Sequence, residues 1–571
     1  MLFNRLKAPV LQRVTVSRFG GLDRRGRGSE GSFLAMENLC SDGDGAMQVR
    51  QRRAVAARLT APGGITDKET LVWVDGHTLC VGGHATGLVL SEGEKQFVSM
   101  GAYLVIFPDK KWINLRNLSQ MGDMEHTVTV SNAALQLCRA DGSGYGDYTA
   151  SATAPGEPEE GALWLDTADA PVLRLYSGGA WTELADTCVA LRSTGIGAGF
   201  AEGDGVEIFG CEEEGLNGLH VLRAVTEDAL IVGGCIAGDR TLTAAVTVSR
   251  TVPDMDYVTE CGNRLWGCKY GVVGGRAVNE IYASKLGDFK NWHCYQGLST
   301  DSYAASRGSD GPFTAAAAYL GSPLFFKERC IERVYPSAGG AHQIVTLECP
   351  GVAEGSHRSV CAVDGTLLYL GRGGVYAFDG GLSAPISQPL GRWALENGVA
   401  GGWEGKYWLS AADEVGAQHL LVYDLRRGLW HREDDLAAVG FACWDGELYA
   451  LATDGTLWAI HGNGVEAEGE VWWMAESGDW GLDTAQRKLP LRLQLCLDLG
   501  PNARIGAQVS GDGGKTWYDA GYLQAGTEGL QAVYWPLRQR RSGHVRLRLT
   551  GQGDCTLYSV SAVYERGSDA P

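Results

Sequence analysis

Adjacent carboxylates are the first residues in this chain that could carry catalytic chemistry, because glycoside hydrolysis needs two acidic side chains facing each other across a cleft. Asp434 directly precedes Asp435, so on a strand the two side chains would point to opposite sides. Glu159 and Glu160 lie in a stretch rich in proline and glycine, which predicts a loop. The chain has 68 acidic residues, so such pairs arise by chance. We therefore interpret both pairs as solvated surface.

Histidine, cysteine and glycine patterns predict neither a metal nor a cofactor site. The eleven histidines include no HxH or HExxH spacing, and the fifteen cysteines, which we expect to be reduced, include no CxxC pair. His293, beside Trp292, is typical of a packed core residue. The glycines around Gly371 lack the strand-to-helix context of a phosphate loop. We expect no catalytic, cofactor-binding or metal-binding residues, no cofactor and no enzymatic activity.

The sharpest motif runs from Ser510 to Trp517, with Asp512, Gly514 and Thr516 at its other fixed positions. It resembles the Asp box, which is found in sialidases and in many unrelated β proteins. The resemblance implies that Asp512 accepts backbone hydrogen bonds within a hairpin, that Gly514 permits the turn and that Trp517 packs below it. The box is a structural turn and occurs once here, so the motif does not predict sialidase activity.

The net charge of −19 is unevenly distributed along the chain. Residues 1–60 carry eleven Lys and Arg against five Asp and Glu, a balance of +6, whereas residues 119–250 carry six Arg against twenty acids, a balance of −14. A basic arm beside an acidic body suggests docking on another protein by complementary charge, with Arg24, Arg25 and Arg27 as candidates. The alternative is an ordinary solvated surface. Nucleic-acid binding by the acidic body is disfavoured, because phosphates would be repelled.

A unit of two strands recurs at about forty residues and predicts the fold. Gly365, Gly405 and Gly446 lie 40 and 41 residues apart, each in a tight turn followed by an aromatic-rich strand, and earlier relatives begin at Cys261 and Gly321. Short strands with this period and no helical pattern are typical of propeller blades. We expect an all-β chain with a β-propeller of about six or seven blades. The fold alone does not name an activity.

The pattern also divides the chain into segments. In order, we expect an N-terminal arm with a ring-closing strand (1–60), the first propeller blade (61–118), an inserted small acidic β domain (119–250), the remaining blades (251–463) and a C-terminal β-sandwich (464–571). The last blade, at 440–460, has only two clear strands. We expect the alternating strand at 10–16 to complete it. No apolar run reaches the length of a membrane-spanning helix, so no membrane partner is expected.

The segment 279–335 contains the runs NEIYASKLGDFKNW, LSTDSY and LFFKE, which begin at Asn279, Leu298 and Leu324. FGGLD at Phe19 and YLGRGGVY at Tyr369 belong to the same pattern. These runs resemble virion proteins encoded in the tail modules of bacteriophages and prophages. The resemblance implies a structural protein of the virion tail, assembled in the cytoplasm of the host bacterium.

The best-understood proteins of this kind are propeller-bearing tail nozzles or hubs of short-tailed phages. They form a ring, often of six copies, beneath the portal and adaptor, and DNA passes through the centre. The resemblance therefore implies a homo-oligomeric ring, expected to be a hexamer, contacts with neighbouring tail, adaptor or portal proteins, and phage DNA that passes without specific binding. The insert and the sandwich depart from the pattern of those nozzles. The alternative is a tail-associated carbohydrate-binding adhesin that grips sugars on the host surface with exposed aromatic side chains of the sandwich or insert.

Overall fold

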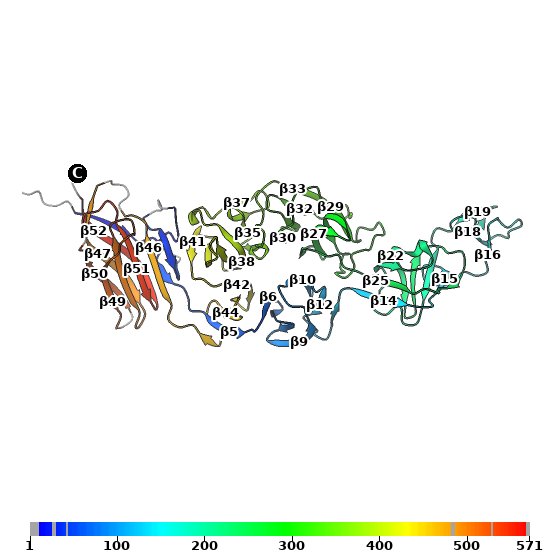
Figure 1. Ribbon diagram of the computed structural model, residues 1–571, viewed down its shortest axis with the longest axis horizontal. Coiled ribbons are helices and arrows are strands. Elements are labelled where there is room, and N and C mark those ends of the chain that lie inside the picture. The colour runs from blue at the N-terminus through cyan, green and yellow to red at the C-terminus, as the bar shows by residue number, and fades with distance from the viewer. Residues whose placement is uncertain are drawn as a thin grey trace, which may run out of the picture. The chain divides into compact units, whose positions relative to one another are not determined.

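The computed structural model describes residues 11–25, 30–41, 44–480, 486–526, 529–538 and 540–566. Within these ranges the chain is all-β (Figure 1). The only helical elements described are three single 3-10 turns, η1 (Glu214–Leu216), η2 (His357–Ser359) and η3 (Gln388–Leu390). No helix in the described part of the chain is long and apolar enough to cross a membrane. The architecture is a β-propeller with an inserted β domain and a C-terminal β-sandwich, which confirms the predicted fold class.

The chain divides into two compact units. The first consists of Met1–Glu94, Phe326–Ile331 and Leu347–Pro571, and the second of Lys95–Phe325 and Glu332–Thr346. The first unit holds four blade sheets. In three of them, consecutive strands pair: β6 (Pro62–Lys68), β7 (Thr70–Asp75), β8 (Thr78–Val81) and β9 (His84–Val89); β34 (Cys361–Val363), β35 (Thr366–Gly371), β36 (Gly374–Phe378) and β37 (Ala384–Pro385); and β38 (Leu395–Trp403), β39 (Lys406–Asp413), β40 (Gln418–Asp424) and β41 (Leu429–Arg432). The fourth sheet has the order β42 (Ala438–Trp444), β43 (Glu447–Ala452), β44 (Thr456–Ala459), β5 (Ala54–Arg58) and β45 (Glu466–Ala467).

The second unit holds three further blade sheets. They are β10 (Gln96–Met100), β11 (Tyr103–Phe107), β12 (Lys111–Asn114) and β13 (Met121–Asp123); β26 (Tyr257–Glu260), β27 (Leu265–Val273), β28 (Arg276–Ala283) and β29 (Tyr303–Ser306); and β30 (Ala315–Tyr319), β31 (Ser322–Phe326), β32 (Ile331–Tyr335) and β33 (Gln343–Leu347). The described residues therefore form seven blade sheets, within the predicted range of six or seven.

The forty-residue repeat is a recurring turn between the first two strands of a blade. In three of these turns the glycine and the residue before it both have positive φ: 44° and 79° at Asp364 and Gly365, and 46° and 74° at Glu404 and Gly405, with the same pattern at Gly446. Two consecutive residues with positive φ are required by the type I′ turn, whose twist matches that of the strands it joins. The repeated acid–glycine pairs thus form the tight turns that join the first two strands of a blade with the correct twist.

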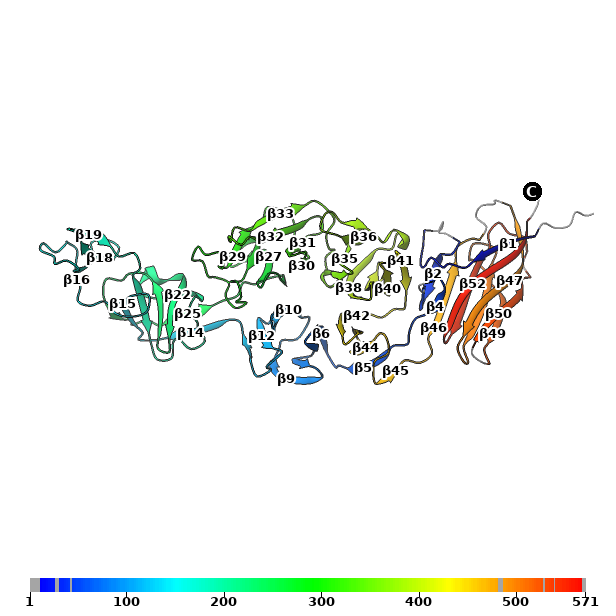
Figure 2. The same cartoon turned by 180° about the vertical axis from the view of Figure 1, so that it is seen from behind.

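The structure corrects the predicted closing strand. β1 (Leu11–Val16) does not enter a blade but pairs antiparallel with β52 (Cys555–Arg566) in the sandwich. The last blade is completed instead by β5, which pairs with β44 from Arg58↔Thr456 to Ala54↔Ala459 (Figure 2). β5 was missed because its sequence, AVAAR, lacks the aromatic and alternating pattern that marks the other strands. A Cβ on Gly464 would lie 2.7 Å from that of Ala54, so the segment after β44 needs glycine where it passes β5.

The boundaries of the first blade and of the insert also differ from the prediction. Residues 61–118 contain one complete sheet, β6–β9, and most of a second, β10–β13, so the insert follows two blades and not one. The second blade was hidden because β7 and β11 begin only 33 residues apart (103 − 70), short of the forty-residue spacing.

The inserted domain builds its own core from two sheets. The larger has the order β14 (His126–Val130), β25 (Val246–Arg250), β21 (Gly205–Phe209), β22 (Gly218–Thr226), β23 (Ala229–Gly233), β20 (Cys188–Arg192), β15 (Ala134–Cys138) and β24 (Arg240–Thr241). The smaller contains β16 (Thr149–Ser151), β17 (Leu163–Asp166), β18 (Val172–Ser177) and β19 (Ala180–Glu183). Leu165 and Leu173 from the smaller sheet belong to the same buried cluster as Leu135 and Val248 from the larger one. Apolar burial of this kind is the main stabilising contribution.

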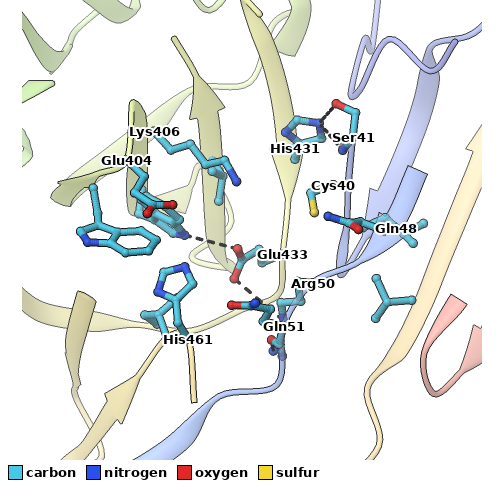
Figure 3. A pocket seen from close by; sticks show the side chains of 16 residues that line it. Cys40, Ser41, Gln48, Arg50, Gln51, Glu404, Lys406, His431, Glu433 and His461 are labelled. Atoms are coloured by element: carbon cyan, nitrogen blue, oxygen red, sulfur yellow. Dashed lines mark hydrogen bonds and ion pairs between the residues drawn. The ribbon is translucent and has the colours of Figure 1, made fainter. Parts of the chain in front are cut away.

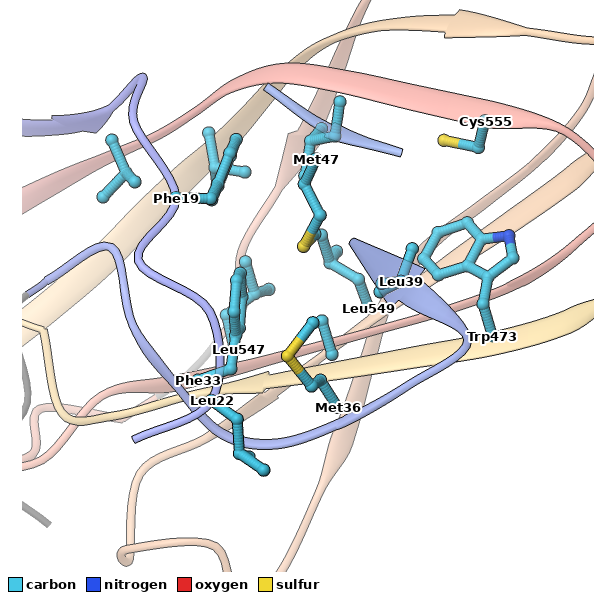
Figure 4. Close-up of a cluster of buried hydrophobic side chains, with 14 of the residues drawn as sticks. Phe19, Leu22, Phe33, Met36, Leu39, Met47, Trp473, Leu547, Leu549 and Cys555 are labelled. Atoms are coloured by element: carbon cyan, nitrogen blue, oxygen red, sulfur yellow. The ribbon is translucent and has the colours of Figure 1, made fainter. Parts of the chain in front are cut away.

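The sandwich uses strands from both ends of the chain. One sheet contains β3 (Leu39–Ser41), β4 (Met47–Val49), β52, β47 (Lys488–Leu499) and β50 (Gly529–Pro536), with β1 on β52. The other contains β2 (Phe33–Glu37), β46 (Trp472–Ser477), β51 (Arg546–Gln552), β48 (Arg504–Ser510) and β49 (Tyr518–Gln524). Met36 and Leu39 from the arm are buried with Trp473 and Leu549 (Figure 4). The predicted sandwich at 464–571 is therefore incomplete without residues of the arm.

Replacing Val55 in β5 by proline is expected to open the last blade. Val55 is buried, and proline removes a ladder hydrogen bond together with part of the buried side chain, a cost of about 3 kcal/mol in the free energy of unfolding. Hydrogen exchange of the β44 amides should accelerate. The matched control is Val14→Pro in β1, which pairs only with β52 in the described structure. Unchanged protection of β44 in the Val55 variant would show that β5 does not hold the blade.

Candidate functional site

The Asp-box residues form a closed turn between β48 and β49. Asp512 Oδ1 accepts hydrogen bonds from the backbone N–H groups of Lys515 and Thr516 at 2.9 Å each, and its Oδ2 accepts one from the Thr516 hydroxyl at 2.6 Å. The Gly514 N–H donates to Ser510 Oγ at 2.9 Å. Hydrogen bonds from Thr516 first, and then from Ser510, hold the pKa of the Asp512 carboxyl well below its usual range. Both carboxylate oxygens of Asp512 and the Ser510 hydroxyl are used within the turn, so the geometry is that of a structural hairpin.

Trp517, the last residue of the motif, lies half-buried beside the turn. The Arg548 guanidinium stacks over its ring, 4.0 Å from the centroid. The ring thus anchors the end of the turn to β51 through a cation–π contact.

The predicted docking arginines are partly engaged within the chain. The Arg24 guanidinium lies 3.9 Å from the centroid of the Trp393 ring, and Arg25 forms an ion pair with Asp23 at 2.7 Å. Arg27 lies outside the described residues. Arg24 therefore fixes this part of the arm against the blade that contains β38–β41, which makes it a less available docking group than its sequence context indicated.

An organised group of polar residues lies where the arm meets the last two blades. A cavity of about 570 Å³ opens here, which we term the arm cavity (Figure 3). It is lined by residues of the arm and of the strands β38–β41 and β44: Leu39, Cys40, Ser41, Gln48, Val49, Arg50, Gln51, Trp403, Glu404, Lys406, Trp408, Val422, His431, Glu433, Ile460 and His461.

Two arginines and three carboxylates, of which Arg50 and Glu433 line the arm cavity, form a group that we term the arginine–carboxylate cluster. Arg53, almost fully buried, reaches Glu433 and Asp434 at 2.7 Å each. Arg50 pairs with Glu468 at 2.8 Å and lies 3.5 Å from Asp434. Charges withdrawn from water are tolerated only when they are paired in this way. The expectation that Asp434 is solvated surface is therefore wrong, because its neighbour in space is Arg53 from the arm.

The protonation of this cluster follows from its burial and charges. Burial raises the pKa of Asp434, but the charges and hydrogen bonds of Arg53, with a contribution from Arg50, outweigh it and leave the pKa below its usual value. The pKa of Asp434 is therefore lower in the folded state than in the unfolded state. Its ion pairs contribute stability above the ordinary pKa of about 3.9, and this contribution is lost as the pH falls through the lower folded-state pKa.

Aromatic and imidazole rings form the other wall of the cavity. The Trp408 indole N–H donates to Glu433 Oε1 at 3.3 Å, and the His461 ring stacks on Trp403 with centroids 4.0 Å apart. His431 is buried against Ser41, and burial lowers its pKa to about 4, so it is neutral near pH 7. Glu404 has its positive φ because it occupies the type I′ turn before β39. Glu433 is thus already paired with Arg50, Arg53 and the Trp408 indole N–H. The residues around the cavity therefore serve chiefly to connect the arm to the blades.

The segment 279–335 runs from β28 to β32, and two of its runs, NEIYASKLGDFKNW and LSTDSY, meet in a long loop of the second unit between β28 and β29. Residues 284–302 fold back over Arg264, whose guanidinium donates to the carbonyl oxygens of Ser284, Ser299 and Asp301 at 2.5–2.8 Å. The Asp301 carboxylate accepts the N–H of Leu298 at 3.0 Å. These bonds satisfy buried polar groups that would otherwise destabilise the fold. We term this segment the clamp loop.

The clamp loop holds the inserted domain. Asn291, fully buried, donates to the Gly203 carbonyl at 2.7 Å and accepts the Gly205 N–H at 3.1 Å. A Cβ on Gly205 would lie 2.2 Å from the His293 carbonyl carbon, so only glycine permits this approach. His293 is half-buried in the loop, and burial lowers its pKa. The residues described contain no group of three or more His, Cys, Asp or Glu side chains placed to hold a metal ion.

No protein-family model matches the chain, and no curated protein matches it. Solved structures that match in fold include the exo-β-1,3-galactanase of Phanerochaete chrysosporium, with 9% identity over 53% of this chain and 94% of that one and a TM-score of 0.22. A glycoside hydrolase family 43 arabinoxylan arabinofuranohydrolase of Bacillus subtilis has 10% identity over 55% and 95% and a TM-score of 0.13. The Trypanosoma rangeli sialidase has 11% identity over 98% and 97% and a TM-score of 0.20.

These comparisons contradict the expectation that the chain is not an enzyme, because the three matched proteins are enzymes. A β-propeller of this kind therefore gives no ground for excluding catalysis. The likeness is one of fold, and no activity or residue role is transferred to this chain.

Replacing Arg53 by methionine is expected to destabilise the fold by about 3–5 kcal/mol near pH 7, because Glu433 and Asp434 would be left buried without their main partner. The loss should shrink as the pH falls below about 4, because the ion pairs of Asp434, whose pKa lies below its usual value, are lost when that carboxyl takes up a proton. Chemical denaturation across this pH range measures both effects. The control Arg58→Met removes an exposed pair with Glu466 and should cost less than about 1 kcal/mol. Equal losses in the two variants would refute the role of the cluster.

Proposed function

We propose that the chain is a structural protein of a bacteriophage tail, a nozzle or hub that forms a homo-oligomeric ring around the DNA exit channel. The observation that carries the proposal is the clamp loop. Two of the sequence runs that resemble tail-module virion proteins, NEIYASKLGDFKNW and LSTDSY, contribute to this loop, which bonds to the backbone of the inserted domain. In this proposal the two runs have an architectural role, because they fix the inserted domain to its blade.

The charge distribution supports the same role. The inserted domain lies within residues 119–250, which have a balance of −14, and the whole chain has a net charge of −19. An acidic wall repels phosphate and lets DNA slide without sticking. In this proposal the chain acts in the virion tail and is assembled in the cytoplasm of the host bacterium, with neighbouring tail, adaptor or portal proteins as its partners.

An exposed apolar patch on the inserted domain supplies a surface for contacts between copies. Phe209 on β21 is 75% exposed and Leu219 on β22 is 55% exposed. Because Leu219 pairs with Glu207, two residues before Phe209, both side chains lie on the same face of the sheet. Leu219 also lines a cavity of about 360 Å³ with Tyr295 of the clamp loop. Exposed apolar patches of this kind mark protein–protein contacts.

The double variant Phe209→Asp, Leu219→Asp is expected to abolish ring formation. Two charges on this patch oppose desolvation at the subunit contact, while exposed substitutions change folding stability by only about 0.5 kcal/mol. Sedimentation velocity should show a ring, expected to contain six copies, for the unchanged chain and a folded monomer for the variant.

The matched control is Val415→Asp, which charges an exposed apolar residue in the β39–β40 turn of the first unit and should leave the ring intact. A monomeric unchanged chain at all accessible concentrations would contradict the proposed ring. A double variant that still assembles would show that the ring uses another surface.

A further inference from the structure

One face of the sandwich has aromatic side chains that are exposed to solvent and lie outside the buried core. Along β46, Trp473 is buried in the core with 1% exposure, whereas its neighbour Trp472 points the other way and is 47% exposed. On β49 of the same sheet, Tyr522 is 61% exposed. Between these strands lies a groove of about 730 Å³, which we term the sandwich groove. Its volume falls within the range of about 300–1,000 Å³ typical of small-molecule sites.

The strand register explains how the groove forms. Met474, Thr550, Gly506 and Tyr522 lie in one row across β46, β51, β48 and β49. Gly506 has no side chain, so the middle of this row is hollow. Trp472, at the outward position before Met474, supplies the flank opposite Tyr522. The result is a floor with aromatic rings on both flanks.

The next row supplies polar groups that are already held in place. Glu476 accepts a hydrogen bond from Arg548 at 2.8 Å, and Gln508 donates to Asp519 at 3.0 Å. The Arg548 guanidinium is further fixed over the Trp517 ring at 4.0 Å. Each pair keeps additional donor and acceptor capacity that its internal bond does not use. The row carries one arginine against two carboxylates, so it offers hydrogen bonds and has no unpaired cation that would attract an anionic ligand.

We propose that the sandwich groove binds a neutral oligosaccharide chain. Sugar rings have apolar C–H faces that pack on exposed aromatic rings, and hydroxyl groups that donate to carboxylates and accept from guanidinium and amide groups. A groove crossing four strands takes an extended chain of such units. The paired charges favour a neutral glycan over an anionic one, because no arginine here is left to balance an added carboxylate. The groove is separate from the Phe209 patch and does not depend on the proposed tail role.

The test uses the full-length chain with cellohexaose, maltohexaose and laminarihexaose as neutral probes and 3′-sialyllactose as an anionic one. Isothermal titration and saturation-transfer NMR should show at least one neutral hexasaccharide binding with a dissociation constant of about 1 mM or tighter. Trp472→Ala and Tyr522→Ala should each weaken that binding about tenfold, the loss expected for one aromatic contact.

Gly506→Leu gives a test that removes no side chain. The backbone of Gly506 lies outside the left-handed region, and a Cβ there would be 3.5 Å from its nearest neighbour, Thr550 Oγ1, so the substitution fills the groove without forcing the sheet. It should weaken binding by about tenfold or more while the melting temperature stays unchanged. If leucine disturbs folding, the smaller Gly506→Ala serves with the same readout. The control is Tyr534→Ala, which removes a 54% exposed tyrosine from β50 of the other sheet and should leave binding unchanged.

Several outcomes would overturn the proposal. They are absence of saturable binding for all three neutral probes, binding of the sialylated probe alone, and full binding in the Gly506 and Trp472 variants. A further overturning result is that the groove variants change the number of copies in the assembly and leave sugar binding intact, since the face would then be a contact between chains.

Discussion

The pairing of β5 with β44 is the constraint on which the rest of the first unit depends. The last blade obtains this strand from a segment about 400 residues earlier in the chain, so the two ends of the propeller sequence must meet before the sheet is complete. Closing such a long loop costs entropy and slows folding. The arginine–carboxylate cluster lies at this junction, where Arg53 pairs with Glu433 and Asp434. Removing one partner of a buried ion pair strongly destabilises the fold, because a buried charge is left unpaired. The cluster therefore disfavours any strand register of β5 in which Arg53 is displaced from its carboxylates.

The same arm joins the propeller to the sandwich. Immediately before β5, the chain supplies β1 to β4 to the two sandwich sheets, and Met36 and Leu39 enter the sandwich core. The arm cavity lies where the arm meets the blades, and Ser41, His431 and Glu433 are among the residues that line it. The second unit uses a comparable device, in which Asn291 of the clamp loop bonds to the backbone of the inserted domain. In both units, an element that is distant or inserted in sequence is fixed by buried polar contacts together with apolar packing.

Local features were predictable from the sequence, and contacts between distant segments were not. The acid–glycine pairs at Gly365 and Gly405 and the motif from Ser510 to Trp517 could be read directly, because each turn is determined by consecutive residues. The roles of β1 and β5 were exchanged, because LQRVTV alternates and AVAAR does not, although AVAAR is the strand that pairs with β44. Arg53 and Glu433 are 380 residues apart, and no single-sequence pattern links them. The exclusion of an enzyme rested on missing motifs, and a fold of this kind, which hosts many unrelated functions, gives no basis for it.

The central proposal is that this β protein is a component of a phage tail ring. Electron microscopy of the phage particle that contains this chain tests it most directly. The account predicts six copies arranged around the tail axis below the portal, with a continuous channel for DNA through their centre. A trimer at the periphery of the tail, or a particle that lacks the chain, would contradict it.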